Sequence, residues 1–168
     1  EIGYGYRSEN YRVKLNLYRT SWKDRFLSTS STFFEDTPQE IRGIANLEGI
    51  TEVHSGIELE TSATFGKLRV SFMGSVGNWE YKDDVSASFF DDNQSPISGT
   101  EAAILYLDGV KVGDAAQITA RLGFNYEITE GFRVDLSRSF YDKLYANINA
   151  KDFGSATHEG SLELPSYS

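Results

Sequence analysis

Apolar and polar residues alternate along this chain in runs that exceed the usual length of a soluble β-strand. In the clearest run, residues 116–128, every second residue is apolar, and most of the residues between them are polar. A period of two residues places one kind of side chain on each face of a β-strand. The pattern restarts after a turn at residues 129–131 and continues to Ala150. These runs predict long strands, each with one apolar face and one polar face.

The same period predicts about six antiparallel strands along the chain. We place them at residues 1–7, 11–26, part of 43–65, 68–85, 103–128 and 132–150. The tail, residues 151–168, is loop-like, and a seventh strand is expected to begin there with Leu162, Leu164 and Tyr167. The expected connections alternate in length: residues 8–10, 66–67 and 129–131 are short, whereas 27–42, 86–101 and 151–161 are long. This asymmetry is typical of outer-membrane β-barrels, which have short periplasmic turns and long extracellular loops.

Two interpretations of the alternation remain open at this point. A soluble antiparallel sheet with one face on a protein core gives the same period. Soluble strands usually have about 5–6 residues, whereas several runs here suggest about fifteen or more. At about 3.3 Å per residue, such strands reach across a bilayer even when they are tilted. Strand length therefore favours the wall of a transmembrane β-barrel.

Aromatic residues gather near both ends of the expected strands. Two such groups fit the aromatic girdles that flank the apolar band of a membrane barrel. The group toward the long loops contains Trp22, Trp79 and Tyr81, and the group near the short turns contains Tyr6, Tyr11, Phe65, Tyr126 and Phe132.

Two charged residues, Arg138 and Asp142, interrupt the apolar face of the run from Phe132. A cation facing lipid near the bilayer midplane costs about 2–4 kcal/mol in a barrel. Either the register shifts there, or these residues lie beyond the hydrocarbon zone, with Arg138 reaching for headgroups.

Composition narrows the possible functions. The chain has 168 residues and a net charge of −9, without a basic stripe, which argues against nucleic-acid binding. It has no cysteine, so it forms neither disulfides nor thiolate metal sites. We see no linker, no domain boundary and no signal peptide. Because the first residue is not Met, we expect a processed or excised piece of a larger protein.

Candidate chemistry is sparse. Glu52, Glu58 and Glu60 share a face with His54, a pattern that suits a wet lumen face better than a metal site. Residues 91–93, Asp-Asp-Asn, lack the ligand spacing of a calcium loop. Neither His54 nor His158 lies in a recognisable catalytic setting. We therefore predict a non-enzymatic protein with no catalytic, cofactor-binding or metal-binding residues.

Several segments resemble the barrel of TonB-dependent outer-membrane receptors of the Bacteroidetes type. They are spread, in order, over nearly the whole chain. The matching segments are Asn16–Arg25, Gly56–Glu60, Asn78–Tyr81, Tyr106–Gln117, Tyr141–Ala146 and Leu164–Ser168, the last of which resembles the lead into a following strand.

The resemblance implies a barrel of about 22 strands around an N-terminal plug. Members of the family import siderophores, cobalamin or glycans with energy relayed by an inner-membrane complex. This chain has no plug, no energy-coupling box and too few strands to be a whole receptor, and it does not end in the usual aromatic strand. No ligand-binding residue of the family transfers to it, and we expect the loops at 27–42 and 86–101 to contact the ligand.

We thus expect residues 1–168 to form an all-β, antiparallel meander of about six long strands, part of a large transmembrane β-barrel in the cell outer membrane. The expected function is active import of a small-molecule ligand. The expected partners are outer-membrane lipid, the remaining barrel strands and plug domain, and the inner-membrane energy-coupling protein acting through the plug. The alternative is a secreted β-sandwich or small β-barrel that binds carbohydrate.

Overall fold

The computed structural model describes residues 1–34, 37–98, 103–113 and 115–168, and this part of the chain is all-β apart from one short turn. Eight strands form one antiparallel sheet. They are β1 (Ile2–Arg7), β2 (Tyr11–Phe33), β3 (Ile41–Phe65), β4 (Leu68–Lys82), β5 (Val85–Asp91), β6 (Ala103–Leu105), β7 (Ile118–Thr129) and β8 (Phe132–Asp142). A separate pair joins β9 (Leu144–Tyr145) to β10 (Glu163–Leu164), and η1 is a 3-10 turn at Ala150–Phe153. Within these ranges, no helix has the length and apolarity needed to cross a membrane.

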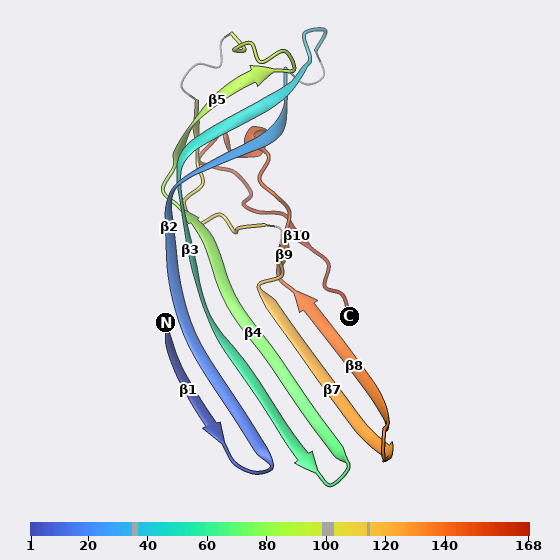
Figure 1. Ribbon diagram of the computed structural model, residues 1–168. Coiled ribbons are helices and arrows are strands. Elements are labelled where there is room, and N and C mark those ends of the chain that lie inside the picture. The colour runs from blue at the N-terminus through green and yellow to red at the C-terminus, as the bar shows by residue number, and fades with distance from the viewer. Residues whose placement is uncertain (35–36, 99–102, 114) are drawn as a thin grey trace.

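The main sheet is an open meander in the order β1-β2-β3-β4-β7-β8 (Figure 1). Its hairpins lie together at one end, where Gly66 and Gly131 have φ of 59° and 80°. Glycine adopts this left-handed region without steric cost, which explains the two tight turns. At the other end, β3 changes partners from β4 to β5. The expected antiparallel meander is confirmed, and the sheet does not close on itself.

The central strands are as long as the alternation predicts. β2 has 23 residues, β3 has 25 and β4 has 15. The expected loop over residues 27–42 is largely wrong, because β2 continues to Phe33 and β3 begins at Ile41. Residues 28–32 are all Ser or Thr, so no apolar residue marks the alternation there. This stretch nevertheless contacts the C-terminal part of the chain, because Thr29 Oγ1 donates a hydrogen bond to the Ile148 carbonyl at 3.0 Å.

Four other expected elements also differ in their bounds. The strand expected over 68–85 ends at Lys82, and the loop expected over 86–101 contains most of β5, which returns along the upper part of β3. The strand expected over 103–128 is broken into β6 and β7, because the segment between them folds over the core. The strand expected over 132–150 ends at Asp142, where Lys143 takes a φ of 53°. Residues 35–36 and 99–102, which fall in the expected loops, lie outside the described residues.

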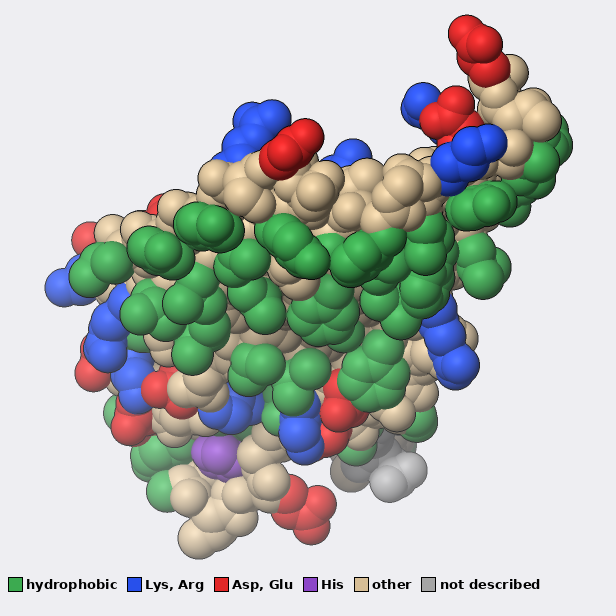
Figure 2. All heavy atoms as spheres, turned by 90° about the horizontal axis from the view of Figure 1, so that it is seen from below, with side chains coloured by type: hydrophobic (Ala, Val, Ile, Leu, Met, Phe, Trp, Pro, Cys, Tyr) green, Lys and Arg blue, Asp and Glu red, His purple; other side chains and the backbone are tan. Residues whose placement is uncertain are grey.

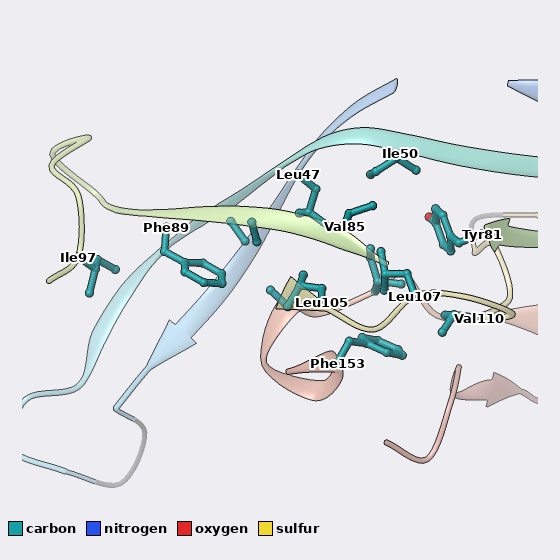
Figure 3. Packing of buried hydrophobic residues seen from close by; sticks show 14 residues of the cluster. Leu47, Ile50, Tyr81, Val85, Phe89, Ile97, Leu105, Leu107, Val110 and Phe153 are labelled. Atoms are coloured by element: carbon teal, nitrogen blue, oxygen red, sulfur yellow. The ribbon is translucent and has the colours of Figure 1, made fainter. Parts of the chain in front are cut away.

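A small hydrophobic core lies at the end of the sheet opposite the hairpins (Figure 3). Leu47 and Ile50 from β3 and Leu105 and Leu107 from the covering segment are almost completely buried. Gly49 has a φ of 74°, and the register between β2 and β3 shifts twice around it. Such a bulge changes which residues of a strand face a given side. It allows both Leu47 and Ile50 to enter the same core, although they are three residues apart.

Candidate functional site: the two faces of the sheet

One face of the six-stranded meander is apolar across every strand. Directly paired residues of an antiparallel sheet share a face, so the register defines rows of side chains that cross the strands. Successive rows on one face are two residues apart on each strand. Starting near the hairpins, the apolar rows are Leu68–Tyr126–Val134, then Tyr11–Ala63–Val70–Phe124–Leu136, Val13–Thr61–Phe72–Leu122–Arg138, Leu15–Leu59–Gly74–Ala120–Phe140, and Leu17–Ile57–Val76–Ile118–Asp142.

These apolar side chains are exposed even on the central strands. Ile57 on β3 is 51% exposed, Val76 on β4 is 57% exposed and Leu122 on β7 is 42% exposed. Figure 2, seen from the hairpin end, shows hydrophobic side chains gathered in one broad band along the sheet. Soluble monomers rarely leave such a continuous apolar surface uncovered. A sandwich would place a second sheet on this face, and none of the described strands lies there.

The apolar rows, hereafter the apolar band, have a defined height. The band extends from Ile57 to Phe65 on β3 and from Ile118 to Tyr126 on β7, nine residues on each strand. The next row away from the hairpins is Arg19–Ser55–Asn78, which is polar. A tilted transmembrane strand needs about 9–11 residues to cross the hydrocarbon core. The height of the band therefore matches the thickness of a bilayer.

The aromatic group near the hairpins lies on this apolar face. Tyr6 pairs with Val13 and Tyr11 pairs with Ala63, and both tyrosines are at least half exposed. Phe65 pairs with Leu68, which in turn pairs with Tyr126, and Phe132 lies two residues from Val134 on β8. The positions of this group agree with the predicted lower girdle.

The upper girdle predicted from Trp22, Trp79 and Tyr81 is wrong. Trp22 and Tyr81 both pair with Glu52, and Trp79 pairs with His54, so all three point to the polar face. Tyr81 is only 5% exposed and belongs to the core. The position of these residues along the strands predicts a girdle. The two-residue period counted from Leu17 and Val76, however, places both tryptophans on the opposite face.

The two tryptophans instead sandwich His54. The ring centroids of Trp22 and His54 are 5.5 Å apart and those of His54 and Trp79 are 5.1 Å apart, and both pairs are stacked. The Trp79 indole donates to the Tyr18 hydroxyl at 2.9 Å. Buried Glu52 lies beneath the stack, with one oxygen 2.6 Å from Arg25 and the other 2.9 Å from His54. Side chains on the polar face thus tie together three neighbouring strands, β2, β3 and β4.

The two charges on the apolar face keep their expected positions. The register between β7 and β8 runs without a shift through both residues, which rules out the register-shift explanation. Asp142 lies in the last apolar row, next to the polar boundary. Arg138 lies two rows further in, in the middle row of the band, so the alternative of a position beyond the apolar zone is wrong for this residue. It is on the edge strand, and its Nη2 donates to the Ser168 hydroxyl at 3.0 Å.

The remaining candidate residues have structural surroundings. Glu58 and Glu60 are exposed on the polar face, as expected. Asp91 accepts hydrogen bonds from the backbone amides of Asn93 and Ser95 at 2.9 and 2.8 Å, which is a turn rather than an ion site. His158 lies against the Phe153 ring, 5.0 Å between centroids, far in sequence from His54. Among the described residues, no three His, Asp or Glu side chains are placed to hold a metal ion.

A group of paired charges lies just beyond the apolar band. Glu80 lies 2.8 Å from the Lys82 ammonium and 3.4 Å from that of Lys111. The hydrogen bond from Lys82 lowers the pKa of Glu80, and the side chain of Asn78 and the two lysine charges act in the same direction against partial burial. This carboxylate therefore stays ionised below its ordinary range.

Comparison with known proteins identifies no relative of this chain. No family model matches it, and neither a curated protein nor a solved structure is significantly similar.

Proposed function

We propose that this chain forms part of the wall of a transmembrane β-barrel in a bacterial outer membrane. One observation carries the proposal: an exposed apolar band crosses all six strands of the meander, with the polar side chains on the opposite face. In a barrel wall the first face meets acyl chains and the second lines the lumen. Acyl chains would remove the apolar band from water, so burial of these side chains would not require a second protein layer.

The open edges of the sheet support a larger assembly. β1 and β8 end the meander, and an unpaired edge is not stable within hydrocarbon. At β8 pairing has already started, because the amide and carbonyl of Tyr141 exchange hydrogen bonds with Tyr167 at 2.9 and 3.0 Å. We infer that further strands cover both edges. The sequence resemblance suggests that the whole is a TonB-dependent importer of a siderophore, cobalamin or glycan, with a plug and an energy-coupling partner.

Single-cysteine labelling tests the lipid contact. The chain has no cysteine of its own, so each introduced thiol takes an environment-sensitive dye without background labelling. We would label positions 118–126 of β7 one at a time, reconstitute the protein in liposomes and measure quenching by brominated lipid. Positions 118, 120, 122, 124 and 126 should be quenched, and the positions between them should not. Uniform exposure to water, or quenching without a period of two, would contradict the proposal.

A further inference from the structure

The polar face contains a hollow of about 520 Å³ between the His54 stack and the hairpins. Its floor is one register row of small residues on four neighbouring strands: Ser62, Ser71, Gly123 and Ser137. Larger side chains occupy the rows on both sides, which makes the row a trough. A Cβ atom at Gly123 would lie 2.8 Å from the Ser71 hydroxyl oxygen, so glycine keeps the centre of the floor open.

Cations outnumber acids in this hollow. Arg12, Lys14, Arg69 and Arg121 line it, whereas its only acids are Glu60 and Asp135, which leaves a charge of +2 (four minus two). The whole chain has a net charge of −9. The hollow is thus a positive region in an acidic protein.

Both acids of the hollow have partners within the protein, whereas two of its arginines have no acidic partner among the described residues. Lys14 lies 3.7 Å from Glu60, and the Asn125 amide donates to Asp135 at 2.6 Å. Within the described ranges, Arg12 and Arg69 form no ion pair.

We propose that this hollow binds a small ligand that carries two or more carboxylate or phosphate groups. Guanidinium groups bind such groups through paired charge-assisted hydrogen bonds. Within the described part of the chain, Arg121 forms one side-chain hydrogen bond, to the Ser137 hydroxyl at 3.0 Å, and thus keeps donors for a ligand. The serine hydroxyls of the floor supply neutral donors. The volume lies within the range of about 300–1,000 Å³ that is common for small-molecule sites.

The arrangement of the arginines favours more than one anionic group. Arg69 lies opposite Asn125 in the register row next to the floor on the side of the hairpins. Arg121 lies in the row on the other side of the floor, four residues from Asn125 along β7. Four residues of a strand span about 13 Å, so the two arginines approach the floor from opposite sides. A ligand with a single charge engages one side only, whereas a di- or tricarboxylate engages both. This site is independent of what covers the apolar face.

Calorimetric titration of the protein in detergent micelles with citrate tests the site, with inorganic phosphate as a second anion and glucose as a neutral control. We expect saturable citrate binding, weaker phosphate binding and no glucose binding. Removal of two charges in the double variant R69Q/R121Q should weaken citrate binding at least tenfold. R133Q is the matched control, because Arg133 lies on the same face, pairs with Glu127 at 3.5 Å and does not line the hollow; its affinity should stay within twofold of the parent protein.

A second variant separates shape from charge. G123V fills the floor while all four cations remain, so it should also weaken citrate binding. Absence of saturable binding, equal losses in R133Q and R69Q/R121Q, or full binding by G123V would overturn the proposal. Since the readout is ligand binding in micelles, failure here leaves the lipid-quenching pattern of β7 unaffected, and the two proposals fail separately.

Discussion

The side chain of Gln117 pairs with the backbone of Trp79 as if it were part of a neighbouring strand. Its Oε1 accepts from the Trp79 amide at 3.0 Å, and its Nε2 donates to the Trp79 carbonyl at 3.0 Å. The same Nε2 also reaches the Val112 carbonyl at 3.3 Å. Gln117 is only 3% exposed and lies where the chain beside β4 passes from residues 110–112 to β7. One amide side chain thus fills the interruption between two strand-like segments.

Replacement of Gln117 with Met should lower the free energy of unfolding by about 1–3 kcal/mol, because it removes the hydrogen-bond partner of the Trp79 amide while it keeps the side-chain volume. The Trp79 carbonyl keeps the hydrogen bond from the Val112 amide at 3.0 Å. Urea unfolding followed by circular dichroism measures this loss. Gln39 is exposed and provides the matched control, and Q39M should change stability by less than about 0.5 kcal/mol. Equal stability of the two variants would show that the Gln117 amide does not bridge the gap.

Replacement of His54 with Leu should disrupt the stack that it forms with Trp22 and Trp79. Stacked ring pairs contribute about 0.5–1.5 kcal/mol each beyond burial, so we expect a loss of about 1–3 kcal/mol for two pairs. These are the only two tryptophans of the chain, so tryptophan fluorescence reports this site alone. Emission should move to longer wavelength as water reaches the rings. H158L, at the other histidine, should leave the emission unchanged.

How far the sequence predicts this structure depends on where the alternation is regular. On β7 the alternation is uninterrupted and correctly identifies the apolar face, and on β8 it does so despite Arg138 and Asp142. Gly66 and Gly131 mark the hairpins. Near Gly49 the bulge changes the phase, so a period of two no longer states which side Leu47 occupies. The Ser/Thr run of residues 28–32 contains no apolar residue, so the sequence predicts a loop where the structure has a strand.

The sequence does not predict the candidate sites, because they depend on the register between strands. Ser62, Ser71, Gly123 and Ser137 are unremarkable one by one and form a floor only when four strands align. Gln117 likewise fits the polar side of an alternating run, and nothing in its sequence context indicates a buried backbone bridge. Residues brought together over long sequence separations are outside the reach of a local pattern.

Truncation of Leu47 to Ala should lower the free energy of unfolding by about 2–5 kcal/mol, because this side chain is fully buried and the surrounding core cannot close the cavity completely. L122A, on the apolar band, is the comparison variant. In detergent micelles its cost should be smaller than that of L47A, because detergent replaces part of the lost contact. If L122A were the more damaging change, protein rather than lipid or detergent would cover the band.

Acidification should remove a small part of the stability through Glu80. Its pKa in the folded protein is lowered from 4.5 mainly by the hydrogen bond from Lys82, so its contribution is present above that ordinary value and is lost as the pH falls through the lowered pKa. Because both side chains are partly exposed to solvent, which screens the pair, the contribution is under about 1 kcal/mol. The stability difference between the parent protein and E80Q should be measurable at pH 7 and should vanish in strong acid. A difference that grows on acidification would contradict this assignment.

A cation placed in the middle of the apolar band should impair membrane insertion. Leu122 lies in the third apolar row and is 42% exposed, so L122R directs a charge away from the sheet on the side of the band. In a bilayer this should cost about 2–4 kcal/mol, a penalty that is greatest near the midplane. T119R is the matched control, because Thr119 lies on the same strand but on the polar face, where it pairs with Ser75. Folding efficiency into liposomes, measured by protection from added protease, should fall for L122R and stay near that of the parent protein for T119R. Equal efficiency of the two variants would mean that the apolar rows of β7 do not face acyl chains, and the wall interpretation would then lose its basis.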